Sequence, residues 1–246
     1  MNRALRPKAP KRRKTLGGVS SVPGNFYARV LGERGPARRV VTGRRTGAFT
    51  GTFPSRKMGQ LVAFESLLEA DLIALLEVSP DVLRFHAQPE TIRWREPTGR
   101  LRRYTPDFLV ETAREGRVYR EVKPRRRLLK DPTLGGRRAR IVAECAERGG
   151  QFEVWTEVEI RAEPRAANVR AILAAGRSAR DKLAEAVIMR ALYHLGRTTL
   201  DELARETGFR LERLVLTVHQ LTALGVIGVD LDRALPDGAI WLRRQP

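Results

Sequence analysis

The stretch TPDFLVETAREGRVYREVK, residues 105–123, decides the predicted fold. It contains two short runs rich in aromatic and β-branched residues, separated by charged residues and Gly116, a pattern typical of two strands joined by a turn. Side chains alternate between the faces of a strand, so Glu121 and Lys123 point to one side and the residue between them points to the other. If the two strands pair antiparallel, Asp107 comes to lie beside Glu121.

Asp107, Glu121 and Lys123 form the pattern PD-x13-E-x-K, with 13 residues between the two acids. Two neighbouring carboxylates can share one Mg²⁺ ion, and oxygen ligands favour Mg²⁺ or Mn²⁺ over zinc. The ammonium group of Lys123 can orient an attacking water and offset charge on a phosphate. The pattern therefore predicts a metal-dependent hydrolytic site. The simpler alternative is an exposed strand pair with a turn aspartate and a Glu-Lys ion pair.

A further acid is expected from the segment upstream. Residues 61–77, LVAFESLLEADLIALLE, carry apolar side chains at helical spacing, which predicts a core-packing helix. Glu65 and Glu69 lie one turn apart on this helix, and both fall within its apolar arc. Burying a carboxylate among leucines is costly unless a cation or another partner compensates it. We therefore expect one of these two glutamates to belong to the site.

The rest of this part of the chain continues with short strands and helices. The expected elements are strands at 82–88, 90–96, 101–111 and 151–155, a hairpin turn at 97–100, and helices at about 136–148 and from about 156. Strands and helices in this order indicate the α/β class, with a mixed sheet flanked by helices.

The pattern becomes helical after about residue 178. Three helical stretches are followed by two short apolar runs around a Pro-Asp-Gly turn at 236–238. Thr199 and Glu202 have the spacing of a capping box, and Gly208 stands where a helix would end. These features predict a small C-terminal winged helix-turn-helix domain.

The charge of the chain points to a polyanionic partner. Lys and Arg number 47 against 28 acids, a formal net charge of +19. Residues 1–45 hold 13 basic residues and one acid, so we expect a flexible basic arm over residues 1–50. Nucleic acid is the expected partner, held through its phosphates. The candidate DNA contacts are Arg12, Arg13, Lys14, Arg56, Lys57, Arg125, Arg126, Arg127 and Lys130.

Other classes of protein are disfavoured by what the sequence lacks. No apolar run is long enough for a membrane span, and the N-terminus has no apolar core for a signal peptide. The single cysteine, Cys145, excludes an intramolecular disulfide and a Cys-based zinc site. His86, His194 and His219 are too dispersed for a histidine-metal motif. We expect a cytoplasmic, DNA-associated prokaryotic protein without a membrane partner.

Four segments, in order, resemble TnsA, the endonuclease subunit of heteromeric cut-and-paste transposases within the PD-(D/E)xK nuclease superfamily. They are FPSRKMGQLVAFESLLEADLIALLE, TPDFLVE, YREVKPRRRL and FEVWTEVEI, which together span about 55–160. The resemblance implies a restriction-endonuclease-like fold. Its serine-x-x-glutamate pattern falls on Ser66 to Glu69, which selects Glu69 over Glu65. Asp107, Glu121 and Lys123 take the remaining catalytic positions, and Glu69, Asp107 and Glu121 become the expected ligands of Mg²⁺.

The same resemblance implies a role at transposon ends. Such a subunit cuts the non-transferred strand, together with a DDE-type, TnsB-like transposase and an AAA+, TnsC-like regulator. The implied domains are a nuclease domain at 51–177 and a winged-helix-like domain at 178–246. Two alternatives stay open. One is a stand-alone nuclease of the same fold, such as a resolvase, phage or defence enzyme. The other is a non-catalytic DNA-binding protein that uses Arg210 and Arg213 of the winged helix.

Overall fold

The computed structural model describes residues 49–243, except for the side chains of 132–135. The predicted arm therefore lies almost entirely outside the described residues, as do Arg12, Arg13 and Lys14. The strands are β1 (Gly51–Ser55), β2 (Gln60–Phe64), β3 (Val82–Ala87), β4 (Ile92–Arg95), β5 (Leu101–Tyr104), β6 (Phe108–Thr112), β7 (Gly116–Val122), β8 (Gly150–Trp155), β9 (Ile227–Val229) and β10 (Ile240–Leu242). The helices are α2 (Leu67–Val78), α3 (Arg125–Leu128), α4 (Pro132–Glu147), α5 (Glu157–Ile160), α6 (Arg165–Ala175), α7 (Lys182–Leu195), α8 (Leu200–Thr207), α9 (Leu211–Ala223) and the short 3-10 helix η1 (Leu235–Asp237).

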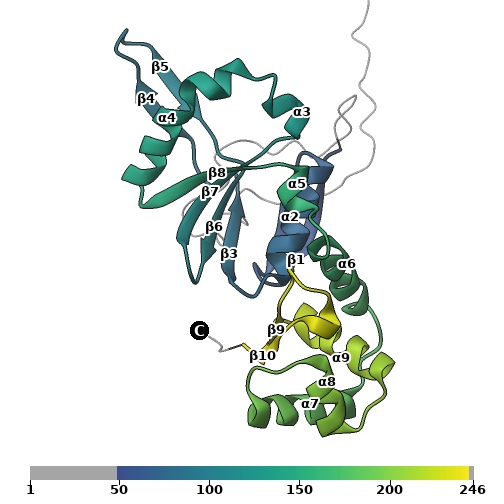
Figure 1. Ribbon diagram of the computed structural model, residues 1–246. Coiled ribbons are helices and arrows are strands. Elements are labelled where there is room, and N and C mark those ends of the chain that lie inside the picture. The colour runs from purple at the N-terminus through teal and green to yellow at the C-terminus, as the bar shows by residue number, and fades with distance from the viewer. Residues whose placement is uncertain (1–48, 244–246) are drawn as a thin grey trace, which may run out of the picture. The chain divides into compact units, whose positions relative to one another are not determined.

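A four-stranded mixed sheet organises the first part of the chain, with strand order β3-β6-β7-β8 (Figure 1). The β6–β7 connection is a tight turn that ends at Gly116, whose φ of +74° is a conformation that glycine adopts without strain. β8 pairs parallel to β7, which requires a crossover, and α3 and α4 provide it. The predicted α/β class with a mixed, helix-flanked sheet is confirmed.

The two faces of the sheet are covered by different elements. On one face, Phe108 and Val110 of β6 belong to the same buried cluster as Leu72 of α2. On the other face, the β4–β5 hairpin and α4 pack over the sheet, with Trp94 and Ile141 in a second buried cluster. Alternate residues of β6 and β7 therefore serve two separate cores.

The helix predicted over 61–77 is wrong in its first third. Residues 60–64 form β2, which pairs antiparallel with β1, and the helix begins only at Leu67. Ser66 is its N-cap and accepts a hydrogen bond from the backbone N–H of Glu69. An apolar run fits both a helix and a strand, and pairing with β1 selects the strand here.

The C-terminal part has the predicted element order. Helices α7, α8 and α9 are followed by an antiparallel pair, β9 and β10. The capping box at Thr199 and Glu202 is confirmed, as is the helix end at Gly208, whose φ is +67°. The predicted boundary at 177/178 falls between α6 and α7, although buried residues on both sides of it belong to one core cluster. The winged-helix assignment stays a prediction.

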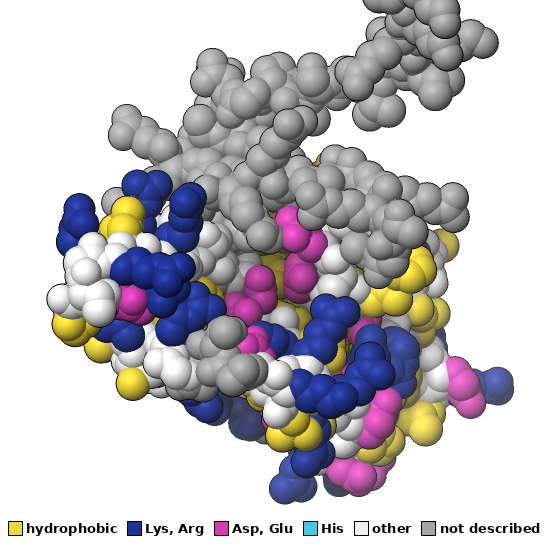
Figure 2. Space-filling view, turned by 90° about the horizontal axis from the view of Figure 1, so that it is seen from above, with side chains coloured by type: hydrophobic (Ala, Val, Ile, Leu, Met, Phe, Trp, Pro, Cys, Tyr) yellow, Lys and Arg dark blue, Asp and Glu magenta, His cyan; other side chains and the backbone are white. Residues whose placement is uncertain are grey.

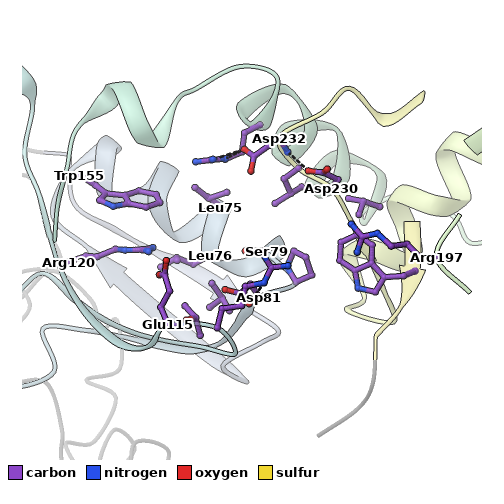
Figure 3. A pocket seen from close by; sticks show the side chains of 18 residues that line it. Leu75, Leu76, Ser79, Asp81, Glu115, Arg120, Trp155, Arg197, Asp230 and Asp232 are labelled. Carbon is purple, nitrogen blue, oxygen red and sulfur yellow. Dashed lines mark hydrogen bonds and ion pairs between the residues drawn. The ribbon is translucent and has the colours of Figure 1, made fainter. Parts of the chain in front are cut away.

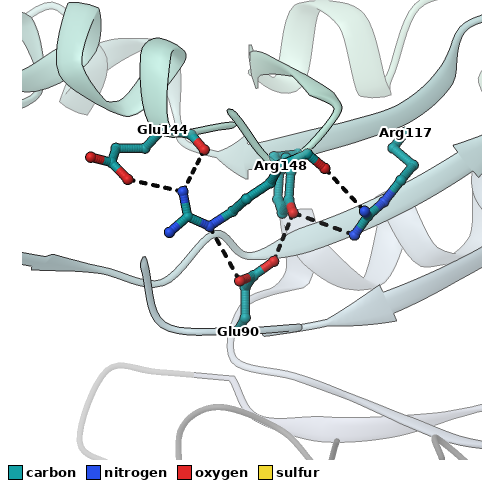
Figure 4. A network of polar contacts seen from close by, with 5 residues as sticks. Glu90, Arg117, Glu144 and Arg148 are labelled. Carbon is teal, nitrogen blue, oxygen red and sulfur yellow. Dashed lines mark hydrogen bonds and ion pairs between the residues drawn. The ribbon is translucent and has the colours of Figure 1, made fainter. Parts of the chain in front are cut away.

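A polar network fixes β7 to its surroundings on the α4 side (Figure 4). The hydroxyl of Tyr119 donates to Glu90 at 2.7 Å, and Arg148 pairs with the buried Glu144 at 2.9 Å. Arg117 closes the network by donating to the carbonyl oxygen of Arg148 at 3.0 Å. Burial would raise the pKa of Glu144, but the hydrogen bonds from Arg148 and Arg140 lower it, so the carboxylate stays charged. The network holds β7 in register with the α4–β8 turn.

Candidate active site

Asp107 and Glu121 lie opposite each other at the end of the two central strands. The last residue pair of the β6–β7 ladder is Phe108 with Arg120, and one step further the register places Asp107 across from Glu121. The Asp107 carboxylate accepts a hydrogen bond from the backbone N–H of Val122 at 2.8 Å, which fixes it against β7. The predicted antiparallel pairing of the two acidic segments is confirmed.

Glu121 is a half-buried carboxylate with a specific partner. The hydroxyl of Tyr104, at the end of β5, donates to Glu121 Oε2 at 2.7 Å. Burial raises the pKa of Glu121 most, and the charge of Glu69 raises it further, while the hydrogen bond from Tyr104 and the charge of Lys123 oppose that rise. Burial and the charge of Glu121 in turn raise the pKa of Tyr104, which keeps its proton available for the hydrogen bond.

Lys123 follows β7 directly. Its backbone N–H donates to the carbonyl oxygen of Trp155 at 2.9 Å, which extends the parallel pairing with β8 past the last residue of the strand. Its ammonium forms an ion pair with Asp131, which lies in the connection between α3 and α4. The two side chains are about equally exposed, at 20% and 21%. Sequence patterns give no signal for Asp131, because it stands in a turn outside the motif.

Glu69 lies in the first turn of α2, and its carboxylate holds the two residues that precede the helix. It accepts hydrogen bonds from the backbone N–H of Glu65 at 2.8 Å and from the hydroxyl of Ser66 at 2.9 Å. The serine-x-x-glutamate pattern thus has a structural role as an N-terminal cap. Glu69 nevertheless lies close enough to Glu121 for its charge to raise the pKa of that residue.

The prediction that Glu65 and Glu69 share one helix is wrong, because Glu65 precedes α2. The Glu65 carboxylate instead accepts a hydrogen bond from the side-chain amide of Gln88 at 3.2 Å. Gln88 is buried, with a φ of +47°, and its backbone N–H donates to the carbonyl oxygen of Asp107 at 2.7 Å. A non-glycine residue in this conformation is uncommon and costs energy. Gln88 links Glu65 to Asp107, and no sequence pattern pointed to it.

The acids offer the oxygen donors that Mg²⁺ and Mn²⁺ prefer, without a histidine or cysteine among them. Glu121 is partly buried and lies near other carboxylates, so its charged form is disfavoured by lost hydration and by repulsion between like charges. A bound cation would offset both effects. In residues 49–243, however, no group of three or more His, Cys, Asp or Glu side chains is arranged to hold a metal ion. The carboxylates of Asp107, Glu121 and Glu69 are each hydrogen-bonded to protein groups instead.

Basic side chains flank an acidic hollow in one view of the surface. Figure 2 shows acidic side chains gathered in a depression, with Lys and Arg side chains on both sides of it. Arg125, Arg126, Arg127 and Lys130 are exposed, as their predicted role in DNA contact requires.

The prediction that Lys57 contacts DNA does not fit its placement. Its ammonium donates to the carbonyl oxygens of Leu76 at 2.6 Å and Ser79 at 2.7 Å, at the C-terminal end of α2. Burial lowers the pKa of Lys57 to about 7, and the charge of Arg243 contributes to that shift. Lys57 therefore caps a helix, whereas its neighbour Arg56 is exposed.

A separate cavity of about 560 Å³ lies on the other side of the sheet, between the end of α2 and the β9–β10 hairpin (Figure 3). Arg120 and Trp155 line it, with the guanidinium 3.9 Å from the ring centroid. None of the predicted catalytic residues lines this cavity. Arg120 and Glu121 are neighbours on β7, and strand alternation directs them to opposite faces.

The mixed sheet, with two acids and a lysine at the end of its central strands, is consistent with a nuclease fold. Residues 79–157 match the family described as TnsA-like endonuclease N terminal, so this segment is similar to a TnsA-like nuclease domain. The match runs from the end of α2 to the start of α5 and includes Asp107, Glu121 and Lys123, but neither Glu69 nor the C-terminal helices. No curated protein was found to match the chain.

Proposed function

We propose that the protein is a metal-dependent DNA endonuclease that hydrolyses a phosphodiester of the non-transferred strand at transposon ends. The observation that carries this proposal is the placement of Asp107 opposite Glu121, with Lys123 two residues further on, inside the TnsA-like segment. Double-stranded DNA is the substrate. The partners are a DDE-type, TnsB-like transposase and an AAA+, TnsC-like regulator, which supply the choice of site.

In this mechanism Asp107, Glu121 and Glu69 hold Mg²⁺, for which Mn²⁺ can substitute. A bound divalent cation would polarise the scissile phosphate and lower the pKa of the attacking water. Lys123 orients that water and offsets negative charge as the phosphate is attacked. Asp131 restrains the Lys123 side chain, so that its ammonium is held near the acids before DNA arrives.

The basic side chains of α3 hold the DNA next to the cut. Arg125, Arg126 and Arg127 follow β7 directly, so contacts with phosphates at this helix place the duplex over the acids. Such contacts position DNA without reading its sequence. We place the protein in the cytoplasm with its DNA. No helix in the described part of the chain is long and apolar enough to cross a bilayer.

Transposon-end cleavage is tested with a DNA duplex that carries the ends of the element encoding this chain. The full chain is incubated with Mg²⁺ and with any DDE-type transposase and AAA+ ATPase that neighbouring genes encode, and the cut strand is mapped at nucleotide resolution. We expect cuts in the non-transferred strand at the element's boundary. Cuts scattered along the duplex without regard to the ends would instead favour a stand-alone nuclease.

The third acid of the site is tested by comparing Glu69→Gln with Glu65→Gln. Glutamine keeps one oxygen, which can still accept the hydrogen bond from the backbone N–H of Glu65, but it lacks the charge that a cation needs. We expect Glu69→Gln to lower the cleavage rate about a hundredfold and Glu65→Gln to lower it much less. A loss confined to Glu65→Gln would show that the wrong glutamate was assigned.

Tyr104 is expected to position the carboxylate of Glu121. Tyr104→Phe removes the hydroxyl and keeps the ring, which packs edge-to-face on Phe152 with centroids 6.0 Å apart. Loss of one hydrogen bond to a charged group should lower the cleavage rate about tenfold and weaken Mg²⁺ binding, with little change in melting temperature. An unchanged rate and unchanged Mg²⁺ affinity would show that Glu121 is positioned without Tyr104.

A further inference from the structure

The β4–β5 hairpin has one apolar face and one arginine-rich face. Ile92 and Trp94 of β4 are buried with Leu109 and Tyr119 of the sheet, and Tyr104 packs beside them. The side chains that alternate with these point to solvent, and all four of them are exposed: Arg93, Arg95, Leu101 and Arg103. The inner face thus fixes the hairpin on the sheet, which sets the direction of the outer face.

Two arginines on the outer face lie directly opposite each other. The antiparallel register pairs Arg93 with Arg103, and like charges at such a position destabilise a strand pair. Among residues 49–243, neither of them forms an ion pair with a carboxylate. On the inner face, by contrast, Arg102 is neutralised by Glu96 at 2.7 Å. The arginine on the inner face of the hairpin is therefore neutralised by a carboxylate, whereas the two paired arginines on the outer face are not.

The hairpin also lies beside the candidate active site. Tyr104, the residue after Arg103, ends β5 and donates its hydroxyl hydrogen bond to Glu121. In Figure 1 the hairpin and α3 lie on opposite sides of the end of the sheet. Figure 2, which looks onto that end, shows basic side chains on both sides of the acidic hollow.

We propose that the outer face of the β4–β5 hairpin binds the phosphate backbone of duplex DNA on one flank of the cleavage site, opposite the flank held by α3. Arg93 and Arg103 are its principal contacts. A phosphate placed between them would turn their repulsion into two attractive contacts, each bidentate in the geometry that guanidinium groups favour. This inference rests on the proposed function for its substrate, but it concerns binding and not cleavage.

The test measures binding of the full chain to a fluorescent duplex of arbitrary sequence at several salt concentrations. The variant is Arg93→Gln with Arg103→Gln. Its control, Arg84→Gln with Arg170→Gln, removes the same charge from two exposed arginines that are paired with Glu111 and Glu163. We expect the hairpin variant to bind about tenfold more weakly at 0.1 M salt, and its log-log salt slope to fall by about 2. The control should bind within about twofold of the unchanged protein.

Each outcome decides the proposal. Equal loss in both variants would mean that only net charge matters, and no loss in the hairpin variant would mean that the arginines serve solubility alone; either result overturns the proposal. A second variant, Arg93→Lys with Arg103→Lys, keeps the charges but not the bidentate geometry. It should bind more tightly than the glutamine variant and keep the salt slope of the unchanged protein, which separates charge loss from misfolding. If the unchanged protein binds this duplex but does not cut transposon ends with Mg²⁺ and its partner proteins, the proposed function fails while the hairpin assignment stands. If it binds no duplex, both fail.

Discussion

Replacing Asp107 with alanine is expected to lower the rate of DNA cleavage at least about a thousandfold. Asp107 lies opposite Glu121 on the two central strands. Its replacement removes one of the two carboxylates that are proposed to bind the cation there. The single-turnover cleavage rate measures the loss directly, and calorimetric titration with Mg²⁺ should show weaker binding by the same variant.

Asp107→Asn is the matched control, because Asp107 has a structural role as well. Its carboxylate accepts the backbone N–H of Val122, and an alanine leaves that donor unsatisfied at a cost of about 1 kcal/mol. Asparagine can still accept this hydrogen bond through its amide oxygen, so we expect near-normal stability together with the same loss of cleavage. An active Asp107→Asn protein would show that the residue only holds the strands together.

Lys123→Ala is expected to lower the cleavage rate about a hundredfold or more, without weakening Mg²⁺ binding. The ammonium is not a ligand, so its removal should affect the chemical step and leave the acids in place. The measurement is the single-turnover rate at saturating Mg²⁺, compared with the binding isotherm of the same protein.

Asp131→Asn serves as the control for Lys123. This variant removes the charge that restrains Lys123 but leaves the ammonium present, so the expected loss is smaller, about tenfold. If Lys123→Ala cuts as fast as the unchanged protein, the ion pair with Asp131 is structural and the lysine has no part in the reaction. If both variants lose activity equally, positioning and not charge is the main contribution of Lys123.

The sequence predicted those elements that are marked by a pattern within a few neighbouring residues, such as strand alternation, a turn glycine or a helix cap. The alternation in β4, β5 and β7 and the glycine at 116 were enough to place a hairpin and a second strand pair, and the capping box at Thr199 marked the start of a helix. The apolar run at 60–64 was misread, because four or five apolar residues fit either period and only pairing with β1 decides between them.

The site residues on the β6–β7 strand pair could be predicted from the sequence. The residues that reach the site from other segments could not. Asp107 and Glu121 follow from strand register alone. Tyr104, Gln88 and Asp131 were missed, since each contacts the site through a loop or a strand end that no local pattern connects to it. Resemblance selects Glu69, whose carboxylate also holds the residues before α2, so one residue has both a structural contact and a proposed catalytic role.

The pairing of arginines on the β4–β5 hairpin also could not be predicted from the sequence, for a related reason. In the sequence they read as ordinary charges within strands, and only the observed register places Arg93 and Arg103 side by side. Whether these arginines can bind DNA depends on which face of the hairpin packs on the sheet, and only the tertiary structure gives that face.

The central claim, that Asp107, Glu121 and Lys123 form a DNA-cutting site, is tested most directly by a nicking assay on supercoiled plasmid. The unchanged protein, Asp107→Ala and Lys123→Ala are compared with Mg²⁺ and with a chelator, in the presence of any DDE-type transposase and AAA+ ATPase that neighbouring genes encode. We predict nicking by the unchanged protein with Mg²⁺ only, and none above background by either variant. Nicking by both variants at the unchanged rate would contradict the account.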